Sequence, residues 1–274
     1  TRDHRVEFRV GLGEDAVELL GRGSYMNHNY TLETQSVVAQ GPRAPPYQLE
    51  APTQLTASVD HVELAPACFV HETRRICAEG RWQRNAGWSL QAATQSFPLE
   101  SLNPDVPGQP RFHGQLFVEA RISGTAGQPW LAAVQAEIRD GLFQYESASG
   151  KEQSIALGRT ILTLQSDPVR HRLHLQLVDA VAADLAAELV AERSAGVSFG
   201  ELPVTGSVRG ATRQLDLLPL LFEDIDHASG SLALDFAVSG RLAAPLLRGE
   251  ARLADGTLDF YQANLRLRDI QATL

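Results

Sequence analysis

Apolar and polar residues alternate along most of this chain, and that period of two limits the possible folds more than any other feature of the sequence. Successive side chains of a β-strand point to opposite faces of its sheet, so alternation predicts a strand with one apolar face. One such strand carries Leu232, Leu234, Phe236 and Val238 on its apolar side. Glycine and proline separate the alternating segments, as turns require. The sequence therefore predicts an all-β, antiparallel fold with one apolar face and one wet face.

Two stretches, at about residues 98–141 and 217–256, share one pattern of glycine, proline and aspartate. In each, a glycine opens a strand that ends in Ser-Gly, a proline follows, and an Asp-Gly pair comes last. The matching positions are Gly114, Gly124, Pro129 and Asp140-Gly141 in the first stretch, and Gly230, Gly240, Pro245 and Asp255-Gly256 in the second. So many aligned features indicate an internal repeat whose unit holds several strands. Because Asp-Gly is a strong hairpin signal, we expect a turn at the end of each unit.

The composition of the chain excludes some functions. Its 274 residues are 43% hydrophobic and 21% charged, which is typical of a folded protein, and carry a net charge of −9. That charge argues against nucleic acid, because a phosphate backbone is held mainly by Lys and Arg. No charge-free apolar run approaches the roughly 18 residues of a membrane span, and the chain has no starting Met or signal peptide. We expect one elongated β domain, residues 1–274, cut from a longer protein whose anchor and export signal lie outside it.

A few segments depart from the alternating pattern. Asp216 is expected to cap a short helix that ends near Ile225, and residues 98–102 would form a shorter counterpart. Residues 180–192 are rich in alanine, but their leucines keep a period of two, which favours a strand. The four prolines of residues 40–53 predict a loop, because proline cannot serve a central strand. The sequence thus predicts one or two short helices.

The two cysteines, Cys68 and Cys77, flank a segment that is apolar at its ends and charged in its middle, as in a hairpin. Residues equidistant from a hairpin turn face each other within disulfide reach. Two other states are possible: free thiols in a reducing cytosol, or zinc bound with His61 and His71, although that spacing matches no standard zinc motif. We expect the disulfide, which indicates an oxidising compartment such as a bacterial periplasm.

Residues 196–200 match the G-x-S-x-G pattern of serine hydrolases, with Ser198 as the nucleophile. Acidic residues and His227 follow in the order that such enzymes use. The motif works only on a tight turn from a strand into a helix. Pro203 and the glycines that follow prevent that helix, so a glycine-flanked turn is expected and a serine hydrolase remains a remote alternative.

Other polar and aromatic residues suggest no catalytic centre. His171 and His174 are an odd number of positions apart on a strand, so they face opposite ways and cannot share a metal. Trp82 and Trp88 form either an aromatic recognition patch or the packed corner of a sheet. We expect no metal, no cofactor and no enzymatic activity.

The repeat unit, its Pro-Leu lead-in and the C…C…G-x-W stretch resemble the TamB family, the translocation and assembly module subunits of the AsmA-like group. The resemblance is to the C-terminal region of that family and covers roughly residues 60–274. The residues that carry it are Cys68, Cys77, Gly80, Trp82, Gly114, Gly124, Pro129, Gly141, Gly230, Gly240, Pro245 and Gly256. It implies a long curved sheet bent like a taco around a hydrophobic groove, in a periplasmic protein of a Gram-negative bacterium that is tethered to the inner membrane.

The resemblance also implies a function and partners. The groove would carry phospholipids between the inner and outer membranes, or assist outer-membrane protein (autotransporter) assembly, together with an outer-membrane β-barrel assembly protein that is TamA-like. Phospholipid acyl chains would lie against the apolar side chains of the strands. The expected lining is Leu116, Val118, Ile122, Val134, Ile138, Leu173, Leu175, Leu177, Leu232, Leu234, Phe236, Val238, Leu258 and Phe260. The alternative is a closed β-sandwich with a binding or scaffold role, because alternation places the same residues inside either architecture.

Overall fold

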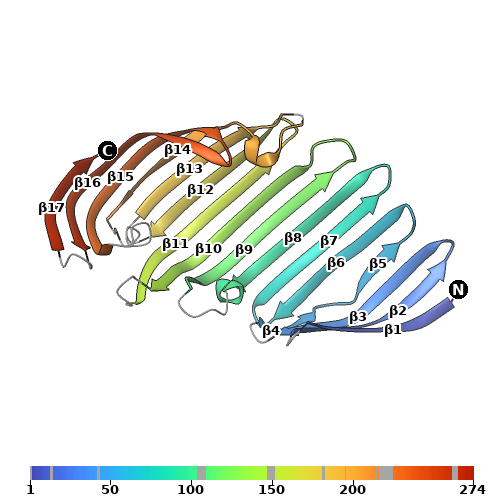
Figure 1. Cartoon of the computed structure of the whole chain (residues 1–274). Coiled ribbons are helices and arrows are strands. Elements are labelled where there is room, and N and C mark those ends of the chain that lie inside the picture. The colour runs from blue at the N-terminus through green and yellow to red at the C-terminus, as the bar shows by residue number, and fades with distance from the viewer. Residues whose placement is uncertain are drawn as a thin grey trace. The chain divides into compact units, whose positions relative to one another are not determined.

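The computed structural model describes residues 2–12, 15–41, 44–103, 109–146, 152–180, 183–194, 196–213, 215, 225–260 and 265–274. Nearly all of these residues are in β-strands, and the 17 strands belong to one sheet (Figure 1). Neighbours along the chain pair antiparallel, for example β11 with β12 and β12 with β13. The all-β, antiparallel fold predicted from alternation is confirmed.

Contacts divide the chain into two compact units. Unit 1 comprises Thr1–Phe97 and Leu116–Val134, and unit 2 comprises Pro98–Gln115 and Gln135–Leu274. Unit 1 contains β1 (Arg2–Leu12), β2 (Asp15–Met26), β3 (Asn29–Gly41), β4 (Ala44–Leu49), β5 (Thr53–Ala57), β6 (His61–His71), β7 (Arg74–Gln83) and β8 (Gly87–Pro98). Strands β9 (Arg111–Gly124) and β10 (Leu131–Glu146) run through both units. Unit 2 contains β11 (Glu152–Ser166), β12 (Arg170–Ala180), β13 (Ala183–Glu192), β14 (Val204–Thr212), β15 (Ile225–Arg241), β16 (Ala244–Phe260), β17 (Leu265–Thr273) and the 3₁₀ turns η1 (Leu99–Leu102) and η2 (Phe199–Glu201).

The two copies of the sequence repeat have matching structures, but their Asp-Gly pairs do not form hairpins. Strands β10 and β16 continue through these pairs, so that expectation is wrong. Asp140 and Asp255 have left-handed backbones, each with φ of 52°. The pairing register of β16 shifts beside Asp255, both against β15 and against β17, as at a β-bulge.

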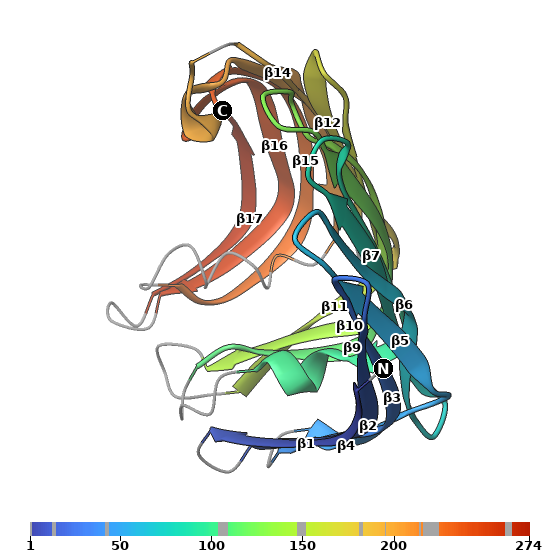
Figure 2. The ribbon, with the colours of Figure 1, turned by 90° about the vertical axis from the view of Figure 1, so that its right-hand side faces the viewer.

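A glycine of the neighbouring strand lies against each Asp-Gly pair. Gly114 and Gly230 have φ of 126° and 132°. A Cβ on Gly114 would lie 2.9 Å from the carbonyl oxygen of Arg139, and a Cβ on Gly230 would lie 2.9 Å from the Cα of Gly256. The repeat therefore encodes a glycine against an Asp-Gly pair, and in the second copy that pair lies at a bulge, which bends strands and increases their twist. Figure 2 shows β16 and β17 curving along their length.

Three expectations about local structure have different outcomes. The short helical segment expected at residues 98–102 is η1, and the alanine-rich segment is a strand, β13. The helix expected from Asp216 falls largely outside the described residues. The loop expected at residues 40–53 is wrong in part, because β4 lies within it. Strand β4 pairs irregularly, with a register shift against β3 and two pairs with β6, and its described pairs include neither Pro45 nor Pro46.

Candidate functional site

Five strands of unit 2 carry one continuous apolar surface. Directly opposite residues of an antiparallel pair share a face, so the register fixes which side chains lie together. We call the resulting set the apolar face of unit 2. From β11 to β15 its rows are Leu164–Leu173–Leu189–Gly206–Val238, then Leu162–Leu175–Ala187–Val208–Phe236, then Thr160–Leu177–Leu185–Gly210–Leu234. Strand β16 extends these rows with Leu247, Gly249 and Ala251. Six residues of the expected lining, three on β12 and three on β15, fall in these rows.

The opposite face of the same strands is charged. Arg209 of β14 pairs with Asp235 of β15 at 3.1 Å between Nε and Oδ1. Glu137 of β10 accepts hydrogen bonds from the Nε atoms of Arg139 and Arg159, at 2.8 and 2.7 Å. These two guanidinium groups hold the pKa of Glu137 down, at about 2. Unit 2 thus separates charge and hydrocarbon onto its two faces.

The apolar face is only half covered by protein. Most of its leucines are half-buried, and Val238 alone among the expected lining is buried, with 6% of its surface exposed. The chain exposes 17478 Å². A compact protein of 29.8 kDa would expose about 11,600 Å², and two compact halves together about 14,000 Å². In the described part of the chain, no second sheet covers these side chains, because all strands belong to one sheet.

The bulge in β16 bends the strands toward the apolar face. Leu215 and Ala228 are each 1% exposed and form a small core. Half-buried residues from both sides of the bulge pack against that core, namely Leu232, Leu253, Leu258 and Phe260. Side chains before and after a bend can share one core only on its concave side. The apolar face is therefore concave at this bend, and Leu258 and Phe260 of the expected lining lie there.

The remaining lining residues belong to β9 and β10. Leu116, Val118 and Ile122 are half-buried, as are Val134 and Ile138. On β10 they alternate with exposed Gln135 and Arg139. Their side chains are thus as accessible as those of the apolar face of unit 2.

A polar cluster closes one end of the apolar face of unit 2. His171 and Ser166 are 6% and 5% exposed, and Nδ1 of His171 lies 2.9 Å from Oγ of Ser166. Arg193 donates a hydrogen bond to the same Oγ at 2.5 Å. Burial, and then the Arg193 charge, lower the pKa of His171. The ring of Phe199 lies edge-on to His171 at 5.3 Å and covers this end.

His174 confirms that the two histidines face opposite ways. Its Nε2 lies 3.8 Å from Glu188 on the charged face, whereas His171 is buried at the end of the apolar face. Within the described residues, no three potential metal ligands form a cluster.

Unit 1 repeats the same division between two faces. Leu64 of β6 lies opposite Leu55 of β5 and Gly80 of β7, and Gly80 lies opposite Leu90 of β8. The next row consists of Val62, Trp82 and Trp88. We call these two rows the apolar face of unit 1. Leu90 is 42% exposed, so the described residues cover this face only in part.

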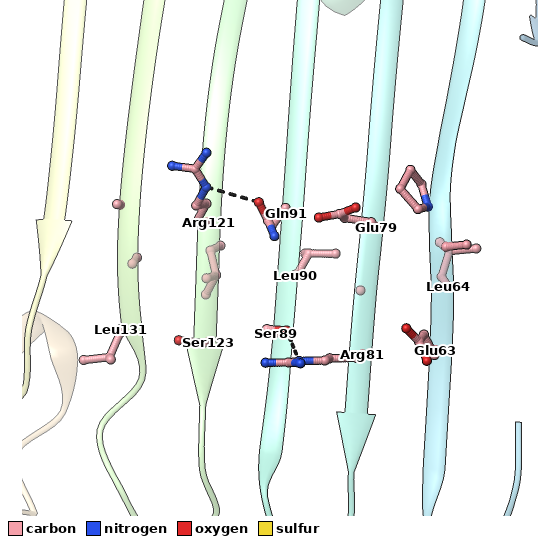
Figure 3. A pocket seen from close by; sticks show the side chains of 16 residues that line it. Glu63, Leu64, Glu79, Arg81, Ser89, Leu90, Gln91, Arg121, Ser123 and Leu131 are labelled. Atoms are coloured by element: carbon pink, nitrogen blue, oxygen red, sulfur yellow. Dashed lines mark hydrogen bonds between the residues drawn. The ribbon is translucent and has the colours of Figure 1, made fainter. Parts of the chain in front are cut away.

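A shallow cavity of about 720 Å³ is lined by residues of β6 to β10 in unit 1 (Figure 3). Its polar side chains stand in two rows across β6 to β9. They are Glu79, Gln91 and Arg121 in one row, and Glu63, Arg81, Ser89 and Ser123 in the other. Hydrogen bonds join Arg121 to Gln91 at 3.1 Å and Arg81 to Ser89 at 3.2 Å. Leu64, Leu90, Ile122 and Leu131 also line it, so the cavity presents both charged and apolar side chains.

The cysteines form the expected disulfide. Cys68 and Cys77 are directly opposite on β6 and β7, with 4.1 Å between their Cα atoms. Free thiols and a zinc site at these residues are therefore excluded. His61 lies 3.4 Å from Glu63, and Nδ1 of His71 lies 3.1 Å from the carbonyl oxygen of Pro46.

Ser198 does not stand on a nucleophile elbow. It precedes the single turn of η2, its side chain makes no capping hydrogen bond, and the chain then enters β14. The strand-to-helix turn that would supply an oxyanion donor is missing from this described segment. The glycine-flanked turn expected there is confirmed.

Several residues of the apolar face of unit 2 are absent from the expected lining. Leu162, Leu164, Leu185, Leu189 and Val208 share the rows of the expected residues. The same alternation marks them, so the signal was available. The glycines at positions 206, 210 and 249 carry no such signal, because only the register places them among the large side chains.

Comparison with known proteins agrees with this architecture. A family model described as "TamB, N-terminal domain" matches residues 2–253. No curated protein and no solved structure gives a significant match. No helix among the described residues is long and apolar enough to cross a membrane. The resemblance inferred from sequence indicated the C-terminal region of TamB, whereas the match is to the N-terminal domain. The chain belongs to the TamB N-terminal domain family.

Proposed function

We propose that the apolar face of unit 2 binds phospholipid acyl chains and carries them along the sheet. The observation that supports this most directly is its half-exposed leucine rows, which are concave at the bulge and which no second sheet covers. Each methylene group that leaves water for such a surface gains about 0.8 kcal/mol. Water against these rows is therefore readily replaced by hydrocarbon.

The dimensions of the face suit a lipid chain. Leu173, Leu175 and Leu177 mark three rows, each two residues from the next, and the pairs Leu232–Thr212 and Leu232–Leu253 add a fourth row. At about 3.4 Å per residue the four rows extend roughly 20 Å. One leaflet contributes about 15 Å to the hydrocarbon core of a bilayer. An acyl chain can thus lie along the strands without leaving the apolar rows.

The family and the disulfide support a location in the bacterial cell envelope. TamB is the translocation and assembly module subunit, and a disulfide persists in an oxidising compartment such as the periplasm. We infer a periplasmic protein of a Gram-negative bacterium, held at the inner membrane by a segment outside this chain. A TamA-like outer-membrane assembly protein is its expected partner. Assistance to outer-membrane protein assembly would use the same surface for unfolded strands.

Site-specific photo-crosslinking tests the proposal. A photoreactive residue at Leu234 or Phe236 lies on the apolar face, and one at Ala237 lies on the charged face of the same strand. After irradiation in cells, mass spectrometry should find phospholipid adducts at positions 234 and 236 and few at 237. Adducts to polypeptide alone would favour protein assembly over lipid transport. Equal lipid labelling on both faces would reject the apolar face as the binding surface.

A further inference from the structure

The three tryptophans of the chain lie near one end of strands β7 to β10, within unit 1. Trp82 and Trp88 are directly opposite each other beside the β7–β8 turn, and Trp130 precedes β10. The β7–β8 and β9–β10 turns are neighbours at the same end (Figure 1), where Oγ1 of Thr125 lies 3.4 Å from the carbonyl oxygen of Ala86. We call Trp82, Trp88 and Trp130 the aromatic rim.

The tryptophans of the rim are exposed, and the ring of Trp88 packs closely against the backbone of Gly124. Trp82, Trp88 and Trp130 are 38%, 41% and 36% exposed. A Cβ on Gly124 would lie 2.8 Å from Nε1 of Trp88, so the indole ring fills the space that this glycine leaves. A preorganised, exposed indole is typical of a binding surface, because little side-chain entropy remains to be lost on contact.

The turns beyond the rim form a polar, braced layer. Arg84 pairs with Asp60 at 3.0 Å and donates a hydrogen bond to the carbonyl oxygen of Val59 at 2.7 Å. Its backbone N–H also bonds the carbonyl oxygen of Asp60 at 2.9 Å. The β5–β6 and β7–β8 turns are thereby joined into one polar end of the sheet.

Polarity falls stepwise from these turns toward the middle of the strands. The charged turn residues come first, then the Val62–Trp82–Trp88 row, then the aliphatic row of Leu64, Gly80 and Leu90, and then Ala67, Ala78 and Ala92. A phospholipid has the same order: a charged headgroup, a polar glycerol ester region, and hydrocarbon. Tryptophan favours that middle region, because its ring is apolar and its N–H is polar.

We propose that the aromatic rim holds the headgroup–acyl boundary of a phospholipid whose chains lie on the apolar face of unit 1. This rests on the proposed function and adds an orientation, with headgroups at the turns of β5 to β10 and chain ends toward the middle of the strands. Apolar side chains of a protein partner would not need that order of polarity.

Intrinsic fluorescence tests the orientation, since every tryptophan belongs to the rim. The protein is loaded from phosphatidylethanolamine–phosphatidylglycerol vesicles whose acyl chains carry bromine, a quencher, near either the ester or the terminal methyl group, and is then separated from the vesicles. Emission should shift to the blue and be quenched more by bromine near the ester. Trp130→Phe should keep the quenching of the Trp82–Trp88 pair, whereas Trp82→Phe with Trp88→Phe should lose most of it.

Each other outcome rejects the orientation. Quenching only while vesicles are present would indicate contact with a bilayer surface, and equal or stronger quenching by the deeper bromine would place the chain ends at the rim. Lipid crosslinks at Leu234 without quenching would reject lipid binding at the aromatic rim and leave the proposed function intact. Loss of both the crosslinks and the quenching would reject the orientation and the proposed function together. The wild-type measurement needs no variant, so it stands even where a tryptophan substitution impairs folding.

Discussion

Leu253 and Leu258 of β16 point to the same side of the sheet although they are an odd number of positions apart. Both pack against the core of Leu215 and Ala228. Strict alternation would place them on opposite faces. The bulge at Asp255 inserts one residue and restores the apolar side after the bend. The bulge thus lets one strand supply the same apolar surface on both sides of a bend.

Gly230→Ala should damage this bend. The backbone of Gly230 has φ of 132°, and a Cβ would lie 2.9 Å from the Cα of Gly256 and 3.0 Å from the carbonyl oxygen of Ala254. Neither backbone atom can move aside without disturbing the pairing of β15 with β16. We expect a loss of roughly 2–4 kcal/mol in the free energy of unfolding, measured by urea denaturation.

Gly127→Ala is the matched control for that substitution. Gly127 also has a positive φ, 76°, but a Cβ there meets nothing within 4 Å. Its cost should be that of the backbone conformation alone, about 1 kcal/mol. Equal losses of unfolding free energy in the two variants would show that the close contact across the bulge adds nothing to the effect of Gly230→Ala.

Local sequence predicted the strands better than it predicted the points where they bend or stop. Alternation identified β13 despite its alanines, because packing on one face requires a period of two. Asp-Gly favours a left-handed backbone, and that conformation serves a hairpin and a bulge equally well. Only the partner strand decides between them, and its position depends on residues far away in the chain. The prolines of β4 excluded a regular central strand but not a short, irregularly paired one.

The Cys68–Cys77 disulfide should stabilise unit 1. It closes a sequence separation of nine residues, for which the chain-entropy relation gives roughly 2–3 kcal/mol. Urea denaturation with and without reductant should show this difference, and a Cys68→Ser, Cys77→Ser double variant should match the reduced protein. Mass spectrometry of unreduced, alkylated protein from the periplasm should find no modified cysteine. Two modified cysteines would argue against the proposed compartment.

Glu137 should make stability depend on acid. Hydrogen bonds from Arg139 and Arg159 lower its pKa from 4.5 to about 2 in the folded protein. The unfolded chain binds the proton more readily, so the stabilisation is present above about pH 4.5 and is lost as the pH falls toward 2. A ¹³C NMR titration of the side-chain carboxyl group should show the low pKa. Glu137→Gln should remove this part of the pH dependence. An ordinary carboxyl pKa for Glu137 would refute its hydrogen bonds with Arg139 and Arg159.

The composition of the apolar face was predictable, and its layout was not. Alternation identifies Leu175 and Phe236 as apolar-face residues from their own neighbours in sequence. Their place in one row, through Ala187 and Val208, follows from the register of four strands. Register depends on long-range pairing, so no local pattern reveals it. For the same reason, the gathering of Trp82, Trp88 and Trp130 at one end could not be deduced from their spacing.

Ser198→Ala should leave any esterase signal of a purified preparation unchanged. Ser198 is exposed and stands before a single 3₁₀ turn, without the helix that a nucleophile elbow needs. A standard chromogenic ester is a suitable substrate, with a mock purification as the control for contaminating enzymes. Loss of turnover in this variant alone would revive the hydrolase hypothesis.

Leu234→Arg should separate lipid binding from folding. Leu234 lies opposite Gly210 and Ala251, two small residues that leave room for a longer side chain. On a half-exposed surface the guanidinium can reach water along its methylene stem, so we expect a loss of only about 1–2 kcal/mol in stability together with loss of lipid transfer. In a closed core the same unpaired charge would cost roughly 4 kcal/mol or more.

Ala237→Arg, on the charged face of the same strand, should retain both stability and lipid transfer. Thermal melts followed by circular dichroism, beside a vesicle-to-vesicle lipid transfer assay, measure the two effects. An unfolded Leu234→Arg variant would favour a closed core, and a folded variant with undiminished transfer would exclude Leu234 from the lipid path.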